Sequence, residues 1–197
     1  LQVTVLFADL FNFTAMSSSM PGEQIIGLLR EFHALVEDAV FACDGTLDKY
    51  IGDGLMATFG TPRPGAQDAT NAVRCARQMV TALNGWNLRR EAAGAPRLQI
   101  GVGLHHGEVT LGDVGSARRL EYTVVGDTVN VASRIESISR ALDTAIIVSD
   151  AVFEAVRREG GEAVLKGFRD LGTHPIRGRR ETIDLWGLTA VSLPAGD

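Results

Sequence analysis

Apolar residues recur along this chain at two spacings, one typical of strands and one typical of helices. Val3, Val5 and Phe7 alternate within a β-rich run, so residues 2–9 are predicted to form a buried strand. Residues 22–42 carry apolar side chains at steps of three and four, which places them on one face of a helix. The chain therefore opens with a strand followed by a long amphipathic helix.

Turn residues and further apolar runs divide the rest of the chain. Gly52-Asp53-Gly54 joins two short β-rich runs, which predicts a compact hairpin with strands over 46–51 and 55–59. Further helices are predicted over 67–92, 128–141 and 150–157, and further strands over 98–111, 120–125 and 145–148. Residues 112–119 are predicted to be a turn or arm, and the chain after 157 to be mostly strand up to Leu188. Asp127 or Thr128 is the expected cap of the helix over 128–141.

The order of these elements is typical of one fold class. A β-α-β-β-α-β start, with two helices crossing a mostly antiparallel sheet, predicts a ferredoxin-like α+β sandwich, here with C-terminal extensions. The sequence has no internal repeat and no low-complexity segment, so we expect a single domain over 1–197 with its core at about 3–188. Because the first residues already have the pattern of a core strand, we expect this domain to be excised from a longer chain.

Composition excludes several classes of protein. Hydrophobic residues make up 45% of the 197 positions, too many for a disordered chain, and no run approaches the ~20 apolar residues of a membrane-spanning helix. The net charge of −5 argues against a nucleic-acid partner. Cys43 and Cys75 fit no metal-ligand spacing, so both are expected to be core residues in a reducing compartment. We expect a cytoplasmic domain that makes no membrane contact itself, even if the full-length protein is anchored to a membrane.

Two aspartates are candidates for a metal site. Asp9 ends the first predicted strand, and Asp53 lies at the tip of the hairpin. In a ferredoxin-like sheet the first strand neighbours that hairpin, so two carboxylates at the same end of adjacent strands would form an oxygen site for Mg²⁺ or Mn²⁺. Each residue alone also has a structural interpretation, Asp9 as a cap of the next segment and Asp53 as an ordinary turn residue. Their combination favours the metal site.

The segment after Asp9 is a candidate for binding phosphate. Residues 11–14 are expected to lead from a strand through a turn into a helix, which leaves backbone N–H groups free. Beside a metal ion such groups can bind a polyphosphate. The chain has no GxxxxGK[ST] segment, which excludes a P-loop enzyme. Taken alone, Phe11 and Phe13 are more often core residues than ligand contacts.

Asn130 and Arg134 are candidates for stabilising charge in a reaction. They are four residues apart, so they share one face of the predicted helix. Close to a metal-bound polyphosphate, an amide and a guanidinium suit phosphoryl transfer. The alternative is a solvated helix face with an ion pair to Glu136 or Asp127.

Other polar residues carry weaker signals. Lys49, on the first strand of the hairpin, could donate to a base or a phosphate, although a lysine on an exposed strand is usually only a solvated charge. His105 and His106 are adjacent in a predicted strand and point to opposite faces, so neither is predicted to be a ligand. Glu121 and Glu136 show no spacing that argues for acid–base catalysis.

Five segments in this order resemble the class III nucleotidyl cyclase catalytic domain, from about Val3 to Leu188. The resemblance is specific because the motifs occur in combination. They are Phe7-Ala8-Asp9-Leu10 with Phe13-Thr14, Lys49-Tyr50-Ile51-Gly52-Asp53, Gly103-Leu104-His105-His106-Gly107, Gly112-Asp113-Val114-Gly115, and Gly126-Asp127-Thr128-Val129-Asn130-Val131-Ala132-Ser133-Arg134.

The resemblance implies an adenylate cyclase. Such an enzyme converts ATP to 3′,5′-cyclic AMP and pyrophosphate in a head-to-tail homodimer with its sites at the subunit interface. Asp9, Asp53 and the carbonyl of Leu10 would hold two Mg²⁺ or Mn²⁺, which assist attack of the ribose 3′-hydroxyl on the α-phosphorus. One chain carries both halves of the site, so a homodimer would have two equivalent sites.

The resemblance also assigns the contacts to ATP. Asn130 of the partner chain would orient the ribose, and Arg134 of that chain would stabilise charge on the α-phosphoryl oxygens. Lys49 and Thr123 would contact the adenine base. The full set of substrate-binding residues implied is Lys49, Thr123, Val124, Phe11, Asn12, Phe13, Thr14 and Arg177, the residues 11–14 acting through their amides.

Thr123, together with Lys49, points to a subgroup of the family. Many family members have an aspartate where Thr123 stands, and a threonine hydroxyl can accept a hydrogen bond from the adenine amino group. The chain therefore resembles the Lys/Thr subgroup, some of whose members respond to bicarbonate, which makes bicarbonate a possible activator. The segment 112–122 resembles the family's dimerisation arm.

One position departs from the family pattern. The family usually has a lysine near the C-terminal strands that holds the terminal phosphates. Lys166, in Leu165-Lys166-Gly167, is one match, and Arg177, in His174-Pro175-Ile176-Arg177-Gly178, is the other. We favour Arg177 because it fits the strand context better, although a guanidinium is larger and planar.

Other functions fit the sequence less well. A guanylate cyclase is the closest enzymatic rival, but guanine readers typically carry a glutamate where Lys49 stands. A catalytically silent module for nucleotide sensing or dimerisation usually lacks an aspartate or the arginine, and here all are present. An RNA-binding ferredoxin-like domain needs aromatics on a basic sheet face, and aromatic content is only 6%. A diguanylate-forming enzyme of related fold would need a Gly-Gly-acidic signature, which is absent.

Overall fold

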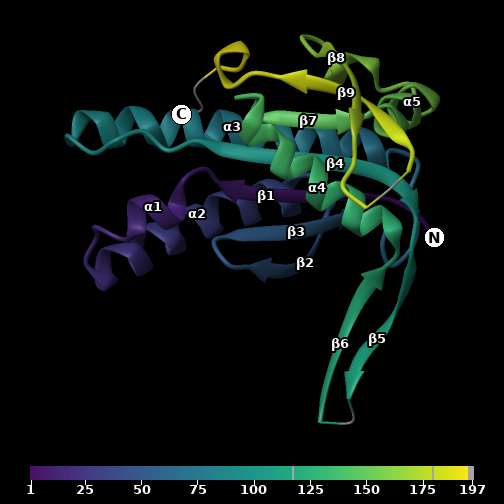
Figure 1. Cartoon of the computed structure of the whole chain (residues 1–197), viewed down its shortest axis with the longest axis horizontal. Coiled ribbons are helices and arrows are strands. Elements are labelled where there is room, and N and C mark those ends of the chain that lie inside the picture. Colours follow the sequence, from purple (N-terminus) through teal and green to yellow (C-terminus); the bar gives the residue numbers. More distant parts are fainter. Residues whose placement is uncertain (117, 179, 195–197) are drawn as a thin grey trace.

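The computed structural model describes residues 1–116, 118–178 and 180–194 (Figure 1). Its strands are β1 (Gln2–Leu10), β2 (Thr46–Ile51), β3 (Gly54–Phe59), β4 (Ile100–Glu108), β5 (Thr110–Ser116), β6 (Arg119–Val125), β7 (Ile146–Ser149), β8 (Arg169–Pro175) and β9 (Thr182–Leu188). Its helices are α1 (Phe13–Ser17), α2 (Gly22–Ala42), α3 (Asp68–Ala92), α4 (Asp127–Ala141) and α5 (Asp150–Arg158), with short 3₁₀ helices η1 (Glu162–Leu165) and η2 (Ala190–Ser192).

Seven strands form the main sheet, in the order β2-β3-β1-β4-β7-β9-β8. The first four strands in that order are the antiparallel ferredoxin-like core, and β7 extends it by pairing parallel to β4. The register places Leu6 of β1 opposite Ala57 of β3 and Leu104 of β4. The predicted fold class, a ferredoxin-like α+β sandwich with C-terminal extensions, is confirmed.

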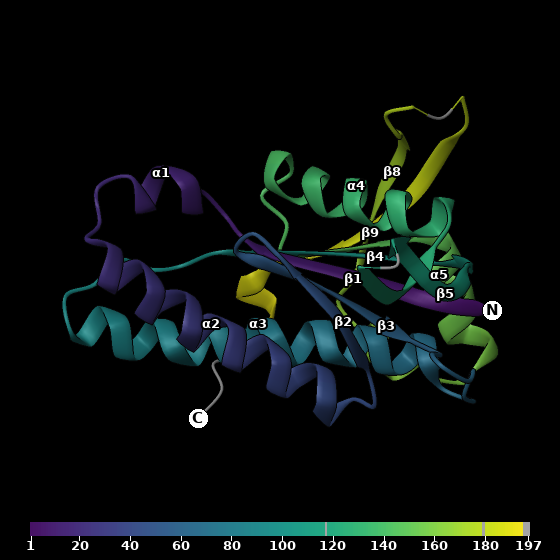
Figure 2. The same ribbon diagram turned by 90° about the horizontal axis from the view of Figure 1, so that it is seen from below.

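Helices cover both faces of this sheet. Figure 2 shows α2 and α3 on one face and α4 on the other. The larger core cluster lies on the α2 and α3 side and includes Phe32, Phe59 and Met79. Cys43 and Cys75 are buried in the same cluster, as expected. Burial of this apolar surface fixes the positions of the strand ends that carry the polar residues described below.

Alternating glycines in β4 let α4 lie directly on the sheet. A Cβ on Gly103 would stand 2.2 Å from the backbone nitrogen of Glu136, and one on Gly101 would stand 2.3 Å from Ser139 Oγ. Strand residues at even separation share a face, so these two positions present no side chain to the helix. The close approach brings the second half of α4 next to the end of β1.

The long strand predicted over 98–111 is in fact two strands. β4 ends at Glu108, and β5 pairs with β6 from Thr110 opposite Val125 to Ser116 opposite Arg119. The two strands leave the body as an arm (Figure 1). Val109, between β4 and β5, is buried, so the hydrophobic pattern continues from one strand to the next. The boundary between the two strands was therefore not visible in the sequence pattern. The arm predicted over 112–119 was therefore too short, and Ala117 lies outside the described residues.

The predicted cap of the helix over 128–141 was also wrong. Gly126 occupies the N-cap position of α4, with a φ of 153° that favours glycine and no side-chain cap bond. Thr128 Oγ1 instead donates to the carbonyl of Glu108 at 2.7 Å. This bond ties the start of α4 to the end of β4.

The chain after residue 157 contains less strand than predicted. η1 precedes β8, and the hairpin of β8 and β9 forms one edge of the main sheet. Short apolar runs such as Glu162–Leu165 do not distinguish a strand from a single helical turn. Among the described helices, none combines the length and the apolar character needed to cross a membrane.

Candidate active site

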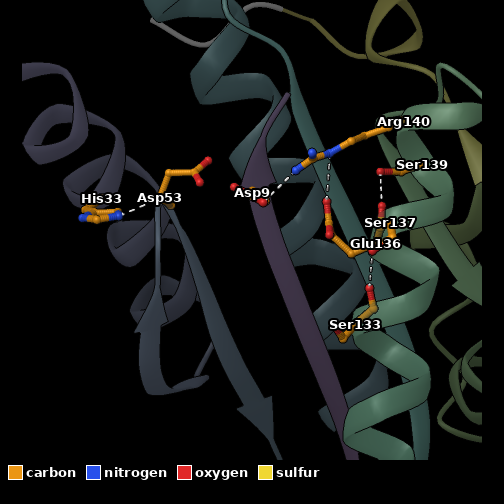
Figure 3. A network of polar contacts seen from close by, with 8 residues as sticks. All are labelled: Asp9, His33, Asp53, Ser133, Glu136, Ser137, Ser139 and Arg140. Atoms are coloured by element: carbon orange, nitrogen blue, oxygen red, sulfur yellow. Dashed lines mark hydrogen bonds and ion pairs between the residues drawn. The ribbon is translucent and has the colours of Figure 1, made fainter. Parts of the chain in front are cut away.

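Asp9 and Asp53 lie close together at one end of the sheet. β1 and β3 are antiparallel neighbours, with Ala8 opposite Leu55, so the end of β1 adjoins the tip of the hairpin. A Cβ on Gly54 would stand 2.4 Å from the carbonyl of Ala8, which shows how closely the hairpin tip approaches β1. In Figure 3 the Asp53 carboxylate extends toward Asp9.

The surroundings of Asp9 make its charge costly. Burial, together with the neighbouring Asp53 carboxyl, raises the pKa of Asp9 to about 8. Asp9 Oδ1 and Asp53 Oδ2 are buried and have no hydrogen-bond partner among the described residues. A buried carboxylate oxygen without a donor is unfavourable unless a cation or a proton reaches it.

Two residues of α4 complete this cluster: Arg140, which the sequence analysis did not single out, and Glu136, which it considered but did not place in the site. Arg140 Nη2 donates to Asp9 Oδ2 at 2.8 Å, and Arg140 Nε lies 4.0 Å from Glu136 Oε1 (Figure 3). Glu136 Oε1 is also buried without a hydrogen-bond partner. Burial raises the pKa of Glu136 to about 7 against the opposing effect of Arg140. The four-residue spacing of Glu136 and Arg140 was a visible signal, but it did not reveal that they face β1.

The aspartate pair has the chemistry that a divalent cation requires. Within the described residues, no group of three or more His, Cys, Asp or Glu side chains is arranged to hold a metal ion. The two carboxylates, however, offer unpaired oxygens at one point, and oxygen ligands are what Mg²⁺ and Mn²⁺ prefer. Asp9, Asp53 and the adjacent backbone of Leu10 therefore fit a metal site.

The segment after β1 lines a hollow beside these aspartates. The hollow has a volume of about 340 Å³ and is lined by Leu10, Asn12, Phe13, Thr14, Ala15, Asp53 and Arg140. The Phe11 N–H donates to the carbonyl of Gln99 at 2.8 Å, so this amide already has an acceptor within the chain. The amides of Asn12, Phe13 and Thr14 remain candidates, because the first turn of a helix leaves its N–H groups without acceptors.

A second cluster lies where β2 meets the base of the arm. Thr123 Oγ1 donates to the Asp48 carboxylate, at 2.7 Å from Oδ2 and 3.0 Å from Oδ1. Lys49 Nζ lies 3.5 Å from Asp48 Oδ2 and 2.8 Å from Glu121 Oε1. The hydrogen bond with Glu121 raises the pKa of Lys49, which keeps the ammonium protonated. Lys49 and Thr123 thus belong to one cluster, with Val124 buried beside Thr123, and Asp48 is a member that the sequence did not indicate.

Asn130 and Arg134 lie on α4, and Arg134 lies near the turn between β8 and β9. A Cβ on Gly178 would stand 3.3 Å from Arg134 Nη2, so the guanidinium lies against the turn that contains Arg177. Lys166 follows η1, and its carbonyl accepts a hydrogen bond from Arg77 of α3, on the opposite face of the sheet from α4. Of the two residues considered for phosphate binding, Arg177 is the one near Arg134.

The groups of one chain fall into two separate sets. Lys49 lies within β2 and Asp53 in the turn that follows it, four residues apart, a separation of at most about 13 Å at ~3.3 Å per residue. No hydrogen bond or ion pair between described residues joins the aspartate cluster to the Lys49 cluster. The aspartates lie at one end of the hairpin, and the Lys49 cluster lies nearer the arm.

This fold and these groups match a known family. A family model described as the adenylate and guanylate cyclase catalytic domain matches residues 1–189. The chain belongs to this family.

The cyclase chain is 33% identical over 190 residues to "Adenylate cyclase 1" of Rhizobium meliloti (strain 1021), an alignment that covers 96% of this chain and 28% of that protein. It is 37% identical over 155 residues to "Adenylate cyclase" of Anabaena cylindrica, which covers 77% of this chain and 30% of that protein. The chain thus spans less than a third of the length of these relatives.

Solved structures of cyclases share the fold. The adenylyl cyclase CyaB from P. aeruginosa superposes with a TM-score of 0.85 at 28% identity, covering 95% of this cyclase chain and 93% of that one. The guanylyl cyclase Cya2 superposes with a TM-score of 0.82 at 29% identity, covering 100% and 94%. Because the two structures are named for different nucleotides, the overall fold does not decide which base this cyclase uses.

Proposed function

We propose that this cyclase domain converts ATP to 3′,5′-cyclic AMP and pyrophosphate. The cluster of Lys49 and Thr123 around Asp48 carries the choice of ATP. Adenine presents an acceptor at N1 and an amino donor at N6, whereas guanine presents an N1–H donor and an O6 acceptor. An ammonium, which only donates, and a hydroxyl that can accept match the adenine pattern.

The aspartate cluster supplies the metal-binding half of the proposed site. Asp9, Asp53 and the Leu10 carbonyl would hold two Mg²⁺ or Mn²⁺, which when bound activate the ribose 3′-hydroxyl and neutralise the triphosphate. The 3′ oxygen forms a bond to the α-phosphorus, the bond from the α-phosphorus to the bridging oxygen breaks, and pyrophosphate leaves with release of the hydroxyl proton. The Asn12, Phe13 and Thr14 amides lie beside the aspartates and would bind phosphate oxygens.

The other chain of a head-to-tail homodimer would supply the second half. Its Asn130 would orient the ribose, and its Arg134 would stabilise charge growing on the α-phosphoryl oxygens. Arg177, in the turn whose Gly178 lies against Arg134, would hold the terminal phosphates. This division is supported by the separation of the two sets of groups within one chain, and by the arm of β5 and β6, which exposes Val114, Leu120 and Tyr122. A homodimer would then have two equivalent sites.

A product assay tests this function. Purified protein is given ATP or GTP with Mn²⁺ or Mg²⁺ over a range of protein concentrations, and cyclic nucleotides are quantified. We expect cyclic AMP from ATP to exceed cyclic GMP from GTP by about tenfold or more, the effect of one mismatched hydrogen bond. Specific activity should rise with protein concentration as dimers form. Cyclic GMP as the main product, or no product from protein that is dimeric, contradicts the proposal.

A guanylate cyclase is the second candidate. The similarity to the guanylyl cyclase Cya2, at 29% identity over the whole of this chain, favours it. The GTP arm of the same assay measures it directly. A catalytically silent sensing module is the third, and it would bind nucleotide without forming product.

Bicarbonate is proposed as an activator because the chain resembles the Lys/Thr subgroup. Its support is Thr123, at the position where many relatives carry an aspartate. Cyclic AMP formation is measured against bicarbonate at fixed pH and ionic strength, with chloride as the matched salt. We expect a rise in rate with bicarbonate alone, and a flat response removes the proposal without affecting the cyclase activity.

A further inference from the structure

Asp48 lies between the two side chains that we propose to contact the base. Thr123 Oγ1 donates to Asp48 Oδ2 at 2.7 Å, and Lys49 Nζ stands 3.5 Å from the same oxygen. The Asp48 side chain is 6% exposed and Thr123 is 5% exposed. Water therefore competes little for the hydrogen bond between them, and the low local dielectric strengthens it.

The direction of this hydrogen bond decides what Thr123 can offer to a ligand. A free hydroxyl can donate its one hydrogen or accept through its lone pairs. A carboxylate can only accept, so the bond to Asp48 uses the hydroxyl hydrogen. Thr123 Oγ1 is then left with lone pairs alone, and any further partner must be a donor.

We propose that Asp48 is a positioning residue that sets base specificity by making Thr123 an obligate acceptor. The inference rests on the proposed function and names a further determinant of it. The 6-amino group of adenine donates to such an acceptor, whereas the 6-oxo group of guanine would meet a second acceptor and lose a hydrogen bond. Asp48 also holds the Lys49 ammonium beside Thr123, so donor and acceptor stand at one edge of the base.

Asp48→Asn is the direct test because it changes hydrogen-bonding capacity with little change of shape. The introduced amide can donate to Thr123 Oγ1, which frees the hydroxyl hydrogen to turn toward guanine O6. The ratio of kcat/KM for ATP to kcat/KM for GTP is expected to fall about tenfold, the effect of one mismatched hydrogen bond. Both nucleotides are assayed on the same preparation, so a reduced fraction of folded protein cancels from the ratio.

Variants of Thr123 show whether the effect passes through its hydroxyl. Thr123→Val should lower the ratio by a similar factor, and Thr123→Ser should keep it. In the Thr123→Val background, adding Asp48→Asn should cause no further fall, because residues that act through one contact are not additive. A purely structural role for Asp48 would instead lower kcat/KM for both nucleotides equally, in either background.

Glu121→Gln is the matched control. Glu121 is the other carboxylate on Lys49, at 2.8 Å, and it is exposed. If Asp48 acted only by placing the ammonium, Glu121→Gln would lower the ratio as much as Asp48→Asn does. We expect the ratio of kcat/KM for ATP to kcat/KM for GTP to stay within about twofold of the parent protein, since an exposed ion pair contributes little.

The outcomes separate the inference from the proposed function. A parent protein that does not prefer ATP contradicts the proposed function before any variant is compared. A parent that prefers ATP, with an unchanged ratio in Asp48→Asn or in Thr123→Val, contradicts the inference and leaves the proposed function standing. The inference is supported if the ratio of kcat/KM for ATP to that for GTP falls about tenfold in Asp48→Asn and in Thr123→Val but not in Glu121→Gln.

Discussion

At the scale of single residues, the proposed metal half of the site gathers carboxyl groups that the fold compensates only in part. Asp9 Oδ1, Asp53 Oδ2 and Glu136 Oε1 are all buried without a hydrogen-bond partner among the described residues. Arg140 contacts Asp9 but is itself half exposed. Buried polar atoms without a hydrogen-bond partner lower the stability of the fold. They are typical of functional sites, where groups needed for activity are often unfavourable for stability.

Asp53→Asn should therefore stabilise the metal-free protein while abolishing its activity. Removing one of two neighbouring carboxylates relieves like-charge repulsion, so the free energy of unfolding should rise by about 1 kcal/mol. The rise in melting temperature that Mn²⁺ causes in the parent should disappear. Chemical denaturation and thermal unfolding with and without Mn²⁺ measure both effects, with Asp38→Asn on the exposed face of α2 as the control. A variant that is less stable and still responds to Mn²⁺ would contradict this account.

Sequence reasoning anticipated the residues whose chemistry is unusual for their position. Asp9 at a strand end and Asp53 at a hairpin tip could be proposed as a pair because the topology alone brings them together. Asp48 and Glu136 could not, because next to Lys49 and Arg140 each has the pattern of an ordinary surface ion pair. Only packing reveals that Asp48 is nearly buried under Thr123, and that Glu136 faces the end of β1.

At the scale of elements, the contact between β4 and α4 positions the site. Gly101 and Gly103 present no side chain to α4, so the helix backbone approaches the strand directly. The alternation of glycines in this strand was visible in the sequence as a glycine-rich stretch. Its meaning was not, because only the structure shows that a second helix layer covers that face of the sheet.

Gly103→Ala should displace α4 and destabilise the fold. The new Cβ would meet the Glu136 backbone at 2.2 Å, and a backbone contact cannot be relieved by a rotamer change. We expect a loss of about 2–3 kcal/mol in the free energy of unfolding, measured by urea denaturation. Gly27→Ala in α2 is the control, since a Cβ there meets nothing within 4 Å, and it should add about 0.5–1 kcal/mol. Equal effects of the two substitutions would contradict the packing described.

His106 on β4 should make the fold sensitive to acid. Burial lowers the pKa of His106, whose Nδ1 lies 2.9 Å from Thr4 Oγ1. A lowered pKa means that the unfolded chain binds the proton more readily, so this stability is present at neutral pH and is lost as pH falls below about 6.5. Melting temperatures are measured at about pH 7.5 and about pH 5.5. The melting temperature of His106→Gln should fall less between these pH values than that of the parent protein. His174→Gln on β8 is the control, and an identical pH response in parent and His106→Gln would refute the prediction.

At the scale of the whole molecule, the proposed site residues of one chain fall into separate sets. The aspartates lie at the hairpin tip, and Lys49 with Thr123 lies toward the arm. The residues of the proposed ribose and phosphate contacts lie on α4 and the hairpin beyond it. The sequence indicated Asp9 and Asp53 in one set and Lys49 and Thr123 in the other, but periodicity and spacing do not measure the distance between the two sets. A dimer in which each site takes one half from each chain accounts for this arrangement.

Mixing two inactive variants tests this account most directly. Asp53→Ala chains lack the metal half, and Arg134→Ala chains lack the charge-stabilising half. A heterodimer of the two has one intact site and one doubly defective site. Since half of randomly paired dimers are heterodimers, an equimolar mixture should recover about a quarter of the parent's cyclic AMP formation. Activity of the mixture that stays at the level of either variant alone, in protein shown to exchange subunits, would contradict a site shared between two chains.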